Sequence, residues 1–328
     1  MSRSLWTPFH ARMHRTIRQH DLLRKNQSIL VAVSGGQDSL CLIKLLIDLQ
    51  PKWNWRLAIA HGDHRWRSDS QANAAFVEDF SKTQDLPFYL RVANPIPASE
   101  AEARNWRYGC FQEIAEKKGF TAIATGHTKS DRAETLLFNL VRGSGTDGLR
   151  SLNWSRDLTP TLKLVRPLLE FTRLETAEFC QTHNLKVWED STNQDLNYAR
   201  NRIRHELLPY LKTHFNSQVE AHLSQTIELL SAEVEYLETV ASEMCEKASS
   251  EEFLGLNRQV LRSLPLAIQR RVVRQFLQRS LDFNPDFGQI EKFVALINAP
   301  NRSRSDPFLK GAIAEVDGDW IYLNRSSI

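Results

Sequence analysis

The sequence contains no apolar run long enough to cross a membrane, which argues against a transmembrane helix. Its N-terminal stretch has basic side chains but no apolar core and no small-residue cleavage site, so it does not resemble a secretory signal. The 4 cysteines are scattered and include no CxxC pair. This spacing argues against a structural zinc site, an iron–sulfur cluster or a disulfide framework, and fits a reducing cytoplasm.

The chain also lacks a strong net charge. It has 42 Lys and Arg against 39 Asp and Glu, and the net charge of +3 does not by itself indicate a nucleic-acid partner. A composition of 41% hydrophobic and 25% charged residues is that of an ordinary globular protein, and 328 residues suit two domains.

Strand and helix patterns alternate through the first two thirds of the chain. Buried-strand patterns at 29–34, 56–61, 88–93, 121–127 and 164–171 are each followed by a helical pattern. Ser99 with Glu102, and Thr172 with Glu175, predict capping boxes at two helix starts. This alternation predicts an α/β fold, a Rossmann-like parallel sheet with helices on both faces.

The pattern changes near residue 215. Apolar residues three or four apart between 219 and 237 predict a long amphipathic helix, and two more helices are predicted around 264–281 and 286–298. Asp317-Gly318 between alternating segments predicts a hairpin. We therefore expect a catalytic domain at 1–214 and a smaller, mainly helical domain at 215–328 that ends in a short hairpin.

A glycine-rich turn follows the first predicted strand and precedes a helix. It consists of Ser34, Gly35, Gly36, Gln37, Asp38 and Ser39. Ligands of an open parallel sheet bind at the carboxyl ends of its strands, and a glycine turn at a helix N-terminus attracts phosphate. The turn lacks the lysine of the GxxxxGK[ST] loop and the spacing of GxGxxG. A carboxylate beside phosphate needs a cation, so we expect Mg²⁺ to bridge Asp38 and the phosphates.

The S-G-G-x-D-S pattern is similar to the pyrophosphate loop of the N-type ATP pyrophosphatases. The resemblance implies an ATP-binding enzyme that adenylates its substrate and releases pyrophosphate. The competing interpretation is a glycine-rich turn that binds nothing.

A second polar cluster follows the fourth predicted strand. His127, Asp131 and Glu134 are four and three residues apart, so they can share one face near the same sheet edge. Two carboxylates beside a histidine suit the binding and deprotonation of an ammonium group. The alternative is a capped, solvated helix start with Glu134 exposed.

Six segments together resemble the tRNA(Ile)-lysidine synthetases over about residues 29 to 212. They are, in order, SGGQDS, AHGDHRWR, SEAEARNWRY, GHTKSDRAETLLFNLVRGSGTDGL, VRPLLEF and WEDSTNQDLNYARNRIRHELLPYL. These cytoplasmic ligases process tRNA. They use ATP to adenylate the wobble cytidine of a tRNA(Ile) with a CAU anticodon, and then attach free lysine. The product, lysidine, changes codon reading from AUG to AUA.

The resemblance also implies residue roles. Asp131 and Glu134 would receive the lysine ammonium, Arg104 and His127 would stabilise phosphate charge, and His61 would line the nucleotide side of the cleft. The alternative for Arg104 is a surface salt bridge. The oligomeric state stays open, with a homodimer as one option.

Two groups of arginines are candidates for binding tRNA. Arg200, Arg202 and Arg204 follow an acidic turn and could contact tRNA phosphates or the ATP site, and Arg270 and Arg274 form a basic stripe in the second domain. Both groups could instead be solvated helix faces.

Other enzyme classes share the glycine-rich loop, including tRNA 2-thiolation enzymes, GMP synthetases and asparagine synthetases. The chain lacks the paired cysteines of a cluster-dependent thiolase, and no glutaminase domain is visible. A non-catalytic tRNA- or nucleotide-binding protein is the alternative from another class. Asp38, Asp131 and Glu134 argue against it.

Overall fold

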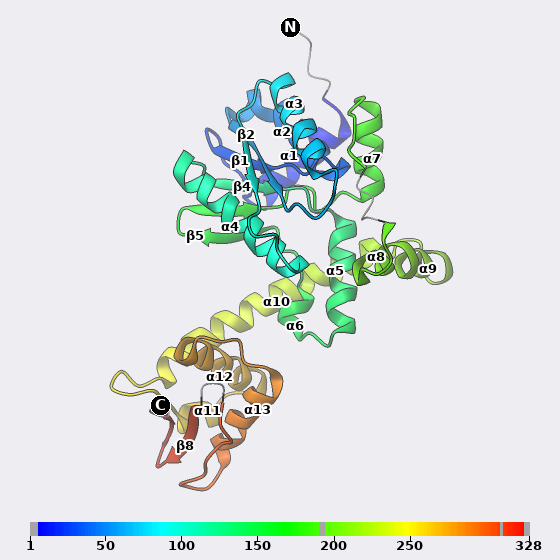
Figure 1. Cartoon of the computed structure of the whole chain (residues 1–328). Coiled ribbons are helices and arrows are strands. Elements are labelled where there is room, and N and C mark those ends of the chain that lie inside the picture. Colours follow the sequence, from blue (N-terminus) through cyan, green and yellow to red (C-terminus); the bar gives the residue numbers. More distant parts are fainter. Residues whose placement is uncertain (1–5, 190–193, 309–310, 325–328) are drawn as a thin grey trace. The chain divides into compact units, whose positions relative to one another are not determined.

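The computed structural model describes residues 6–189, 194–308 and 311–324 (Figure 1). The chain forms two compact units, Met1–Glu228 and Leu229–Ile328. In the described part of the chain, no helix is both long and apolar enough to span a membrane.

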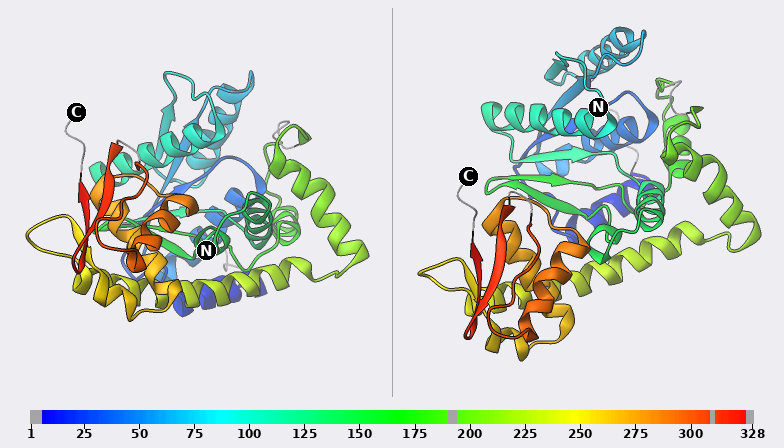
Figure 2. Two further views of the ribbon diagram at one scale, coloured as in Figure 1. Left: turned by 90° about the horizontal axis from the view of Figure 1, so that it is seen from below. Right: turned by 60° about the horizontal axis from the view of Figure 1, so that its bottom comes forward.

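A six-stranded sheet with the order β3-β2-β1-β4-β6-β5 forms the centre of the first unit (Figures 1 and 2). Its strands are β1 (Ser28–Ala32), β2 (Arg56–Asp63), β3 (Phe88–Val92), β4 (Ala122–Thr125), β5 (Ser155–Thr159) and β6 (Leu162–Val165). All neighbouring pairs are parallel except β5 and β6, which are antiparallel. The predicted α/β class is confirmed, with an antiparallel edge strand that was not predicted.

Helices cover both faces of this sheet. The helical elements of the unit are α1 (Pro8–Gln19), α2 (Gln37–Trp53), α3 (Ser70–Thr83), α4 (Glu100–Lys118), α5 (Lys129–Val141), α6 (Thr146–Leu149), α7 (Arg173–Thr182), α8 (Ala199–Arg202), the π-helical turn η2 (Ile203–Leu207), α9 (Leu208–His214) and α10 (Val219–Ala248). Because side chains alternate along a strand, Ile29 and Val31 pack with α1, α2 and α7. Leu30 faces the other way and packs against Phe111 of α4.

The predicted fifth strand, 164–171, is wrong beyond Val165. Pro167 has no N–H to donate to a strand ladder, and the chain turns so that Leu168 and Leu169 enter the core. The capping box of Thr172 and Glu175 is confirmed, with Thr172 N 2.7 Å from the Glu175 carboxylate.

Only half of the other predicted capping box forms. Ser99 accepts from the Glu102 amide at 3.2 Å, but the Glu102 carboxylate accepts from Ala98 N instead of the N-cap amide. The helix nevertheless begins where the sequence predicts, at Glu100.

The second unit combines helices with a small antiparallel sheet in the order β7-β9-β8. Its elements after α10 are β7 (Gly255–Asn257), α11 (Arg258–Arg262), α12 (Leu266–Leu281), α13 (Phe287–Ala295), the 3₁₀ turn η3 (Leu296–Asn298), β8 (Ile313–Asp317) and β9 (Trp320–Asn324). The hairpin at Asp317-Gly318 is confirmed, with Gly318 at φ +56°.

The long amphipathic helix is also confirmed, but it belongs to both units. Val219 and Leu223 pack against Ala133 and Leu208 of the first unit, whereas Ala241 lies in the core of the second. The compact units therefore divide within α10, after Glu228. The limits 1–214 and 215–328 remain a prediction about domains.

Candidate active site

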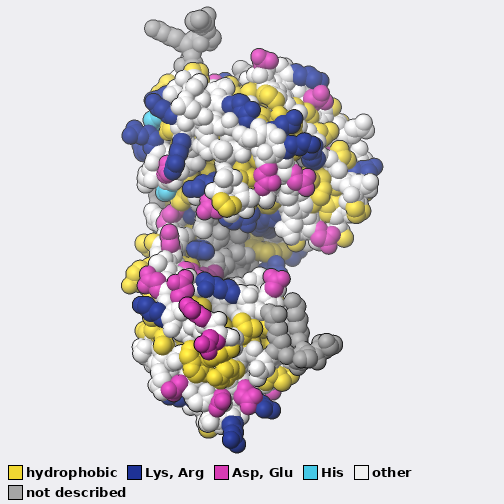
Figure 3. Space-filling model, turned by 90° about the vertical axis from the view of Figure 1, so that its left-hand side faces the viewer, with side chains coloured by type: hydrophobic (Ala, Val, Ile, Leu, Met, Phe, Trp, Pro, Cys, Tyr) yellow, Lys and Arg dark blue, Asp and Glu magenta, His cyan; other side chains and the backbone are white. Residues whose placement is uncertain are grey.

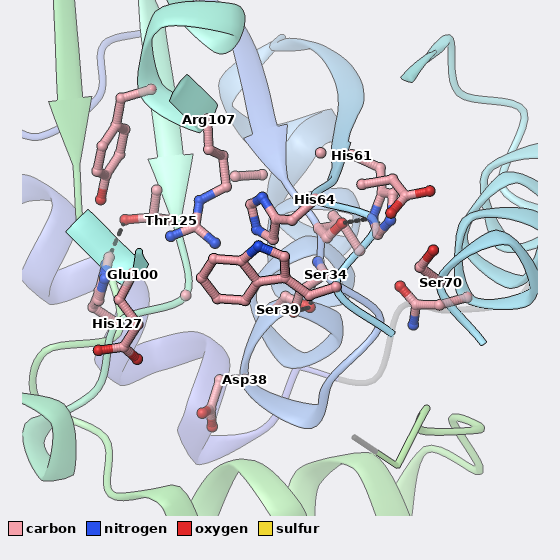
Figure 4. A pocket seen from close by; sticks show the side chains of 18 of the residues that line it. Ser34, Asp38, Ser39, His61, His64, Ser70, Glu100, Arg107, Thr125 and His127 are labelled. Atoms are coloured by element: carbon pink, nitrogen blue, oxygen red, sulfur yellow. Dashed lines mark hydrogen bonds between the residues drawn. The ribbon is translucent and has the colours of Figure 1, made fainter. Parts of the chain in front are cut away.

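A pocket of about 680 Å³ opens where the strand order reverses, between the carboxyl ends of β1 and β4. This switch point is where open α/β sheets bind ligands. The loop after β1 contributes Ser34, Asp38 and Ser39 to the pocket, and the segment after β4 contributes Gly126 and His127 (Figure 4).

The conformation of the glycine-rich loop requires glycine at position 35. Gly35 has φ +89°, and a Cβ there would lie 2.9 Å from the Asn73 amide nitrogen. Ser39 Oγ accepts from Ser34 N at 3.1 Å and donates to Gly36 O at 2.8 Å. These bonds hold the turn at the N-terminus of α2, whose first-turn amides and dipole favour an anion.

Gln37 differs from the other predicted loop residues. Its side chain donates to Arg173 O at 2.7 Å and contacts Thr176 Oγ1 at 3.2 Å, so it ties α2 to α7. It is absent from the described lining of the pocket, which leaves its backbone as the group that could meet a phosphate.

Gly126 was not identified from the sequence. A Cβ at this position would lie 2.9 Å from the carbonyl carbon and oxygen of Asp38. The glycine therefore allows the end of β4 to approach the first turn of α2. A glycine directly after a buried strand is the signal that could have indicated it.

Arg173, the first residue of α7, joins the predicted acidic residues. Its guanidinium lies 2.6 Å from Asp131 Oδ1, 2.9 Å from Glu134 Oε1 and 3.3 Å from Asp38 Oδ2. Thr176 also donates to Asp38. Arg173 was not identified from the sequence, although a cation in the first turn of a helix opposes the helix dipole and is a recognisable signal.

Arg204 completes the cluster. It binds Glu134 with two bonds, Nε to Oε1 at 2.8 Å and Nη2 to Oε2 at 2.9 Å. Glu134 is 3% exposed, so the alternative of a solvated, exposed glutamate is wrong. Asp131 fits both the functional interpretation and the helix-cap interpretation. It lines the pocket, and it also caps α5 by accepting from Thr128 N at 2.7 Å.

Burial and neighbouring charges set the protonation of these groups. Burial raises the pKa of Asp38 and outweighs the opposing charge of Arg173. Burial acts in the same direction on Asp131, but there Arg173, His127 and the bonds from Thr128 lower the net pKa below its usual value. Asp131 is therefore an anion near neutral pH.

His127 is neutral. Burial, with the nearby charge of Arg166, lowers the pKa of His127 to about 3. Its Nδ1 lies 2.8 Å from Thr125 Oγ1. His127 can therefore stabilise a phosphate, as predicted from the sequence, only through a hydrogen bond and not through a positive charge.

The wall of the pocket next to β2 contains two histidines and an arginine. His61 is buried, with Nδ1 2.8 Å from Val33 O, and burial lowers its pKa. Burial also lowers the pKa of His64, to about 4. Figure 4 shows the guanidinium of Arg107 reaching into the pocket near His64 and Thr125.

Arg104 is placed differently from Arg107. Its guanidinium lies 5.7 Å from the centre of the Tyr108 ring, and it is not among the described residues that line the pocket. The two arginines are three positions apart on α4, and Arg107 is the one whose side chain enters the cavity.

The donor set fits Mg²⁺ only together with a nucleotide. Among the described residues, no group of three or more His, Cys, Asp or Glu could hold a metal ion by itself. Mg²⁺ usually takes one or two carboxylates, with phosphates and water as its other ligands. Asp38 at the loop supplies one such carboxylate.

The arginines predicted to bind tRNA have varied environments. Arg204 lies in the acidic cluster, Arg202 is exposed, and Arg200 lies 5.7 Å from the Phe138 ring centre. In the second unit, Arg270 is 2.7 Å from Glu291 and Arg274 is 2.5 Å from Glu238. On the face seen in Figure 3, acidic and basic side chains are interspersed over that unit.

Comparisons with known proteins agree with this geometry. Residues 7–211 match the family model of the PP-loop domain, and residues 256–308 match the TilS substrate binding domain. The likeness to a solved structure, a U34-tRNA thiolase from Methanococcus maripaludis, has a TM-score of 0.56 at 16% identity, over 68% of this chain and 79% of that one. At this identity the likeness shows the fold alone.

The sequence relatives are much closer. A tRNA(Ile)-lysidine synthase of Nostoc sp. is 57% identical over 98% of both chains. The Synechocystis sp. enzyme is 50% identical over 96% of this chain and 97% of its own length. A chloroplastic enzyme of Pyropia yezoensis is 37% identical over 97% and 96%. With the PP-loop pocket and the acidic cluster in place, the chain belongs to the tRNA(Ile)-lysidine synthase family.

Proposed function

We propose that the protein uses ATP to join lysine to the wobble cytidine of a tRNA(Ile) with a CAU anticodon, producing lysidine, AMP and pyrophosphate. Family membership over the whole chain supports this activity. The observation that carries it is the meeting of a pyrophosphate loop with the acid pair of Asp131 and the buried Glu134. Arg173 contacts Asp38 of the loop and both Asp131 and Glu134.

In the first step the C2 oxygen of cytosine attacks the α-phosphate of ATP, and the bond to pyrophosphate breaks. Ser34, Ser39 and the N-terminus of α2 hold the leaving pyrophosphate. Mg²⁺ bound by Asp38 would neutralise phosphate charge. Arg107 reaches into the pocket and supplies positive charge for the reacting phosphate.

In the second step the lysine ε-amine attacks C2, the bond from C2 to the phosphorylated oxygen breaks, and AMP leaves. The amine arrives as an ammonium with a pKa near ~10.4, so it needs anionic partners and must lose a proton. Asp131 and Glu134 hold the ammonium. The lowered pKa of Asp131 suits electrostatic binding better than proton removal, which leaves Glu134 as the carboxylate that accepts the ammonium proton.

The ammonium must compete with two arginines. Arg173 binds both Asp131 and Glu134, and Arg204 binds Glu134. Lysine therefore enters by sharing or displacing these contacts. This competition favours a ligand with a cationic end and disfavours neutral amino acids.

Incorporation of labelled lysine tests the function. With ATP and Mg²⁺, the protein is expected to label tRNA(Ile) with CAU and to leave tRNA(Met) with the same anticodon unlabelled. Absence of label at every Mg²⁺ concentration would overturn the proposal. Cytoplasmic location and a homodimer remain predictions from the sequence.

A further inference from the structure

A second hollow, of about 570 Å³, lies on α5, α8, η2 and α9. We call it the α5–α9 groove. Phe138, Val141 and Tyr210 give it an apolar lining, and Arg142, Arg202 and Glu206 are its charged lining residues. Its volume is within the range of small-ligand sites.

Apolar side chains in and beside the groove are largely exposed to solvent. Val141 is 79% exposed and Tyr210 55% exposed, and the neighbouring Leu140 is 56% exposed. A contiguous exposed apolar surface usually marks a binding site. None of these side chains has a role in the mechanism above.

The α5–α9 groove shares its walls with the active site. Helix α5 places Asp131 in the lining of the pocket and, further along, presents Phe138 and Val141 to the groove. Helix α5 contacts both α8 and η2, and Figure 1 shows α5, α8 and α9 together. An extended ligand in the pocket could therefore continue into the groove.

The charges favour an anionic occupant. The guanidinium of Arg142 lies 5.0 Å from the centre of the Phe138 ring, and that of Arg200 lies 5.7 Å from it. Arg202 is held beside the groove by bonds to Leu196 O at 2.7 Å and Asn197 O at 3.1 Å. Two lining arginines thus face one lining acid, Glu206, and Arg200 adds a third positive charge beside Phe138. Aromatic surfaces combined with arginines are typical of sites for unstacked bases.

We propose that the α5–α9 groove holds an unstacked base of the RNA substrate, from a nucleotide next to the modified cytidine. The base stacks on Tyr210 and packs on Val141, and its flanking phosphates pair with Arg142 and Arg202. The inference rests on the proposed function, because it takes the partner to be the same RNA. An apolar peptide or a second copy of the chain would leave the arginines around Phe138 without anionic partners.

Steady-state kinetics test the proposal. Tyr210→Ala and Val141→Ser are expected to raise the KM for tRNA about tenfold each, in line with the loss of one stacking contact, and to leave the KM for ATP unchanged. Tyr210→Phe keeps the ring and should behave as wild type. Tyr236→Ala is the matched control, because Tyr236 is 69% exposed on α10 and lies outside the groove.

A spectroscopic probe reports the base directly. Anticodon stem–loop RNAs carry 2-aminopurine on one side or the other of the wobble cytidine. Wild type and Tyr210→Phe are expected to quench the fluorescence of one of them, and Tyr210→Ala should not. Quenching is measured without lysine or ATP, so it tests the groove even if lysine incorporation fails.

Three results would overturn the proposal while lysine incorporation stays intact. The first is an unchanged KM for tRNA in both groove variants. The second is absence of quenching of either RNA by the wild-type protein. The third is a wild-type dimer that the variants convert to monomers, by sedimentation, with tRNA kinetics unchanged, because the groove would then join two copies of the chain.

Discussion

Arg173 donates to Asp131 at 2.6 Å, and this ion pair links the first turn of α7 to the first turn of α5. The same guanidinium reaches Asp38 in the first turn of α2. One cation therefore neutralises parts of both the proposed nucleotide site and the proposed lysine site. Substrate binding must redistribute these contacts, because Arg173 binds both the carboxylate proposed for Mg²⁺, Asp38, and those proposed for the lysine ammonium, Asp131 and Glu134.

Removal of Arg173 should destabilise the protein. Arg173→Ala leaves Asp38 and Asp131 without their closest cation, although Glu134 keeps Arg204, and we expect a loss of about 3 kcal/mol in the free energy of unfolding. The pKa of Asp131 should rise, because Arg173 now lowers it. Urea denaturation measures the loss. Arg12→Ala is the control. Arg12 pairs with Glu175, which lies on the same helix as Arg173, and this pair is more exposed. Equal losses in the two variants would contradict a special role for Arg173.

Replacement of Asp38 should abolish activation. Asp38→Asn removes the carboxylate that we assign to Mg²⁺, and the rate of pyrophosphate release should fall by about 10²- to 10³-fold. The measurement is pyrophosphate release across a Mg²⁺ titration, with circular dichroism to verify the fold. Asp48→Asn, on the same helix but bonded to His10 and Lys44, should keep most activity. Wild-type rates in Asp38→Asn would remove the assigned role.

His127 should make the protein sensitive to acid. Its pKa is about 3 in the folded protein against ~6.5 when unfolded, so below neutral pH the unfolded state binds a proton that the folded state does not. Its contribution to stability therefore falls as the pH decreases from 6.5. His127→Gln should show a smaller decrease in Tm between pH 7 and 5 than wild type. The exposed His205→Gln serves as control, and identical slopes in all three proteins would contradict the burial effect.

The basic stripe of the second unit can be tested by salt dependence. If Arg270 and Arg274 contact tRNA phosphates, Arg270→Gln with Arg274→Gln should weaken tRNA binding and reduce its salt slope by about 2. Fluorescence anisotropy with labelled tRNA, at several salt concentrations, measures both. Arg304→Gln is the control, since Arg304 pairs with Glu315 and is exposed. Unchanged affinity and slope would leave these arginines as partners of Glu291 and Glu238 only.

The sequence predicted the strand and helix order because each buried strand and amphipathic helix has its own periodicity. It missed α1, although Met13 and Ile17 are fully buried, since the basic residues around them obscure the pattern. It also missed β5, an edge strand in which Arg156 and Asp157 are exposed. These segments have weak local signals and are fixed by tertiary packing.

The site was predicted in outline for a similar reason. Motifs located the loop and the acid pair, but Arg173 is 135 residues from Asp38 in the chain, and no local spacing relates them. The choice between Arg104 and Arg107 depends on how α4 is rotated against the sheet. That rotation is decided by packing, which a helical pattern with several arginines on neighbouring faces does not specify.

The number of residues in the π-helical turn η2 determines which way the side chains before and after it face. Arg204 in this turn lines the catalytic pocket, whereas its neighbour Ile203 and the following Tyr210 line the α5–α9 groove. Deletion of one residue from Ile203–Leu207 would rotate everything after it by about 100° around the helix axis. Tyr210 would then leave the groove. The extra residue of the wide turn thus acts as a spacer that sets which side chains face the catalytic pocket and which face the α5–α9 groove.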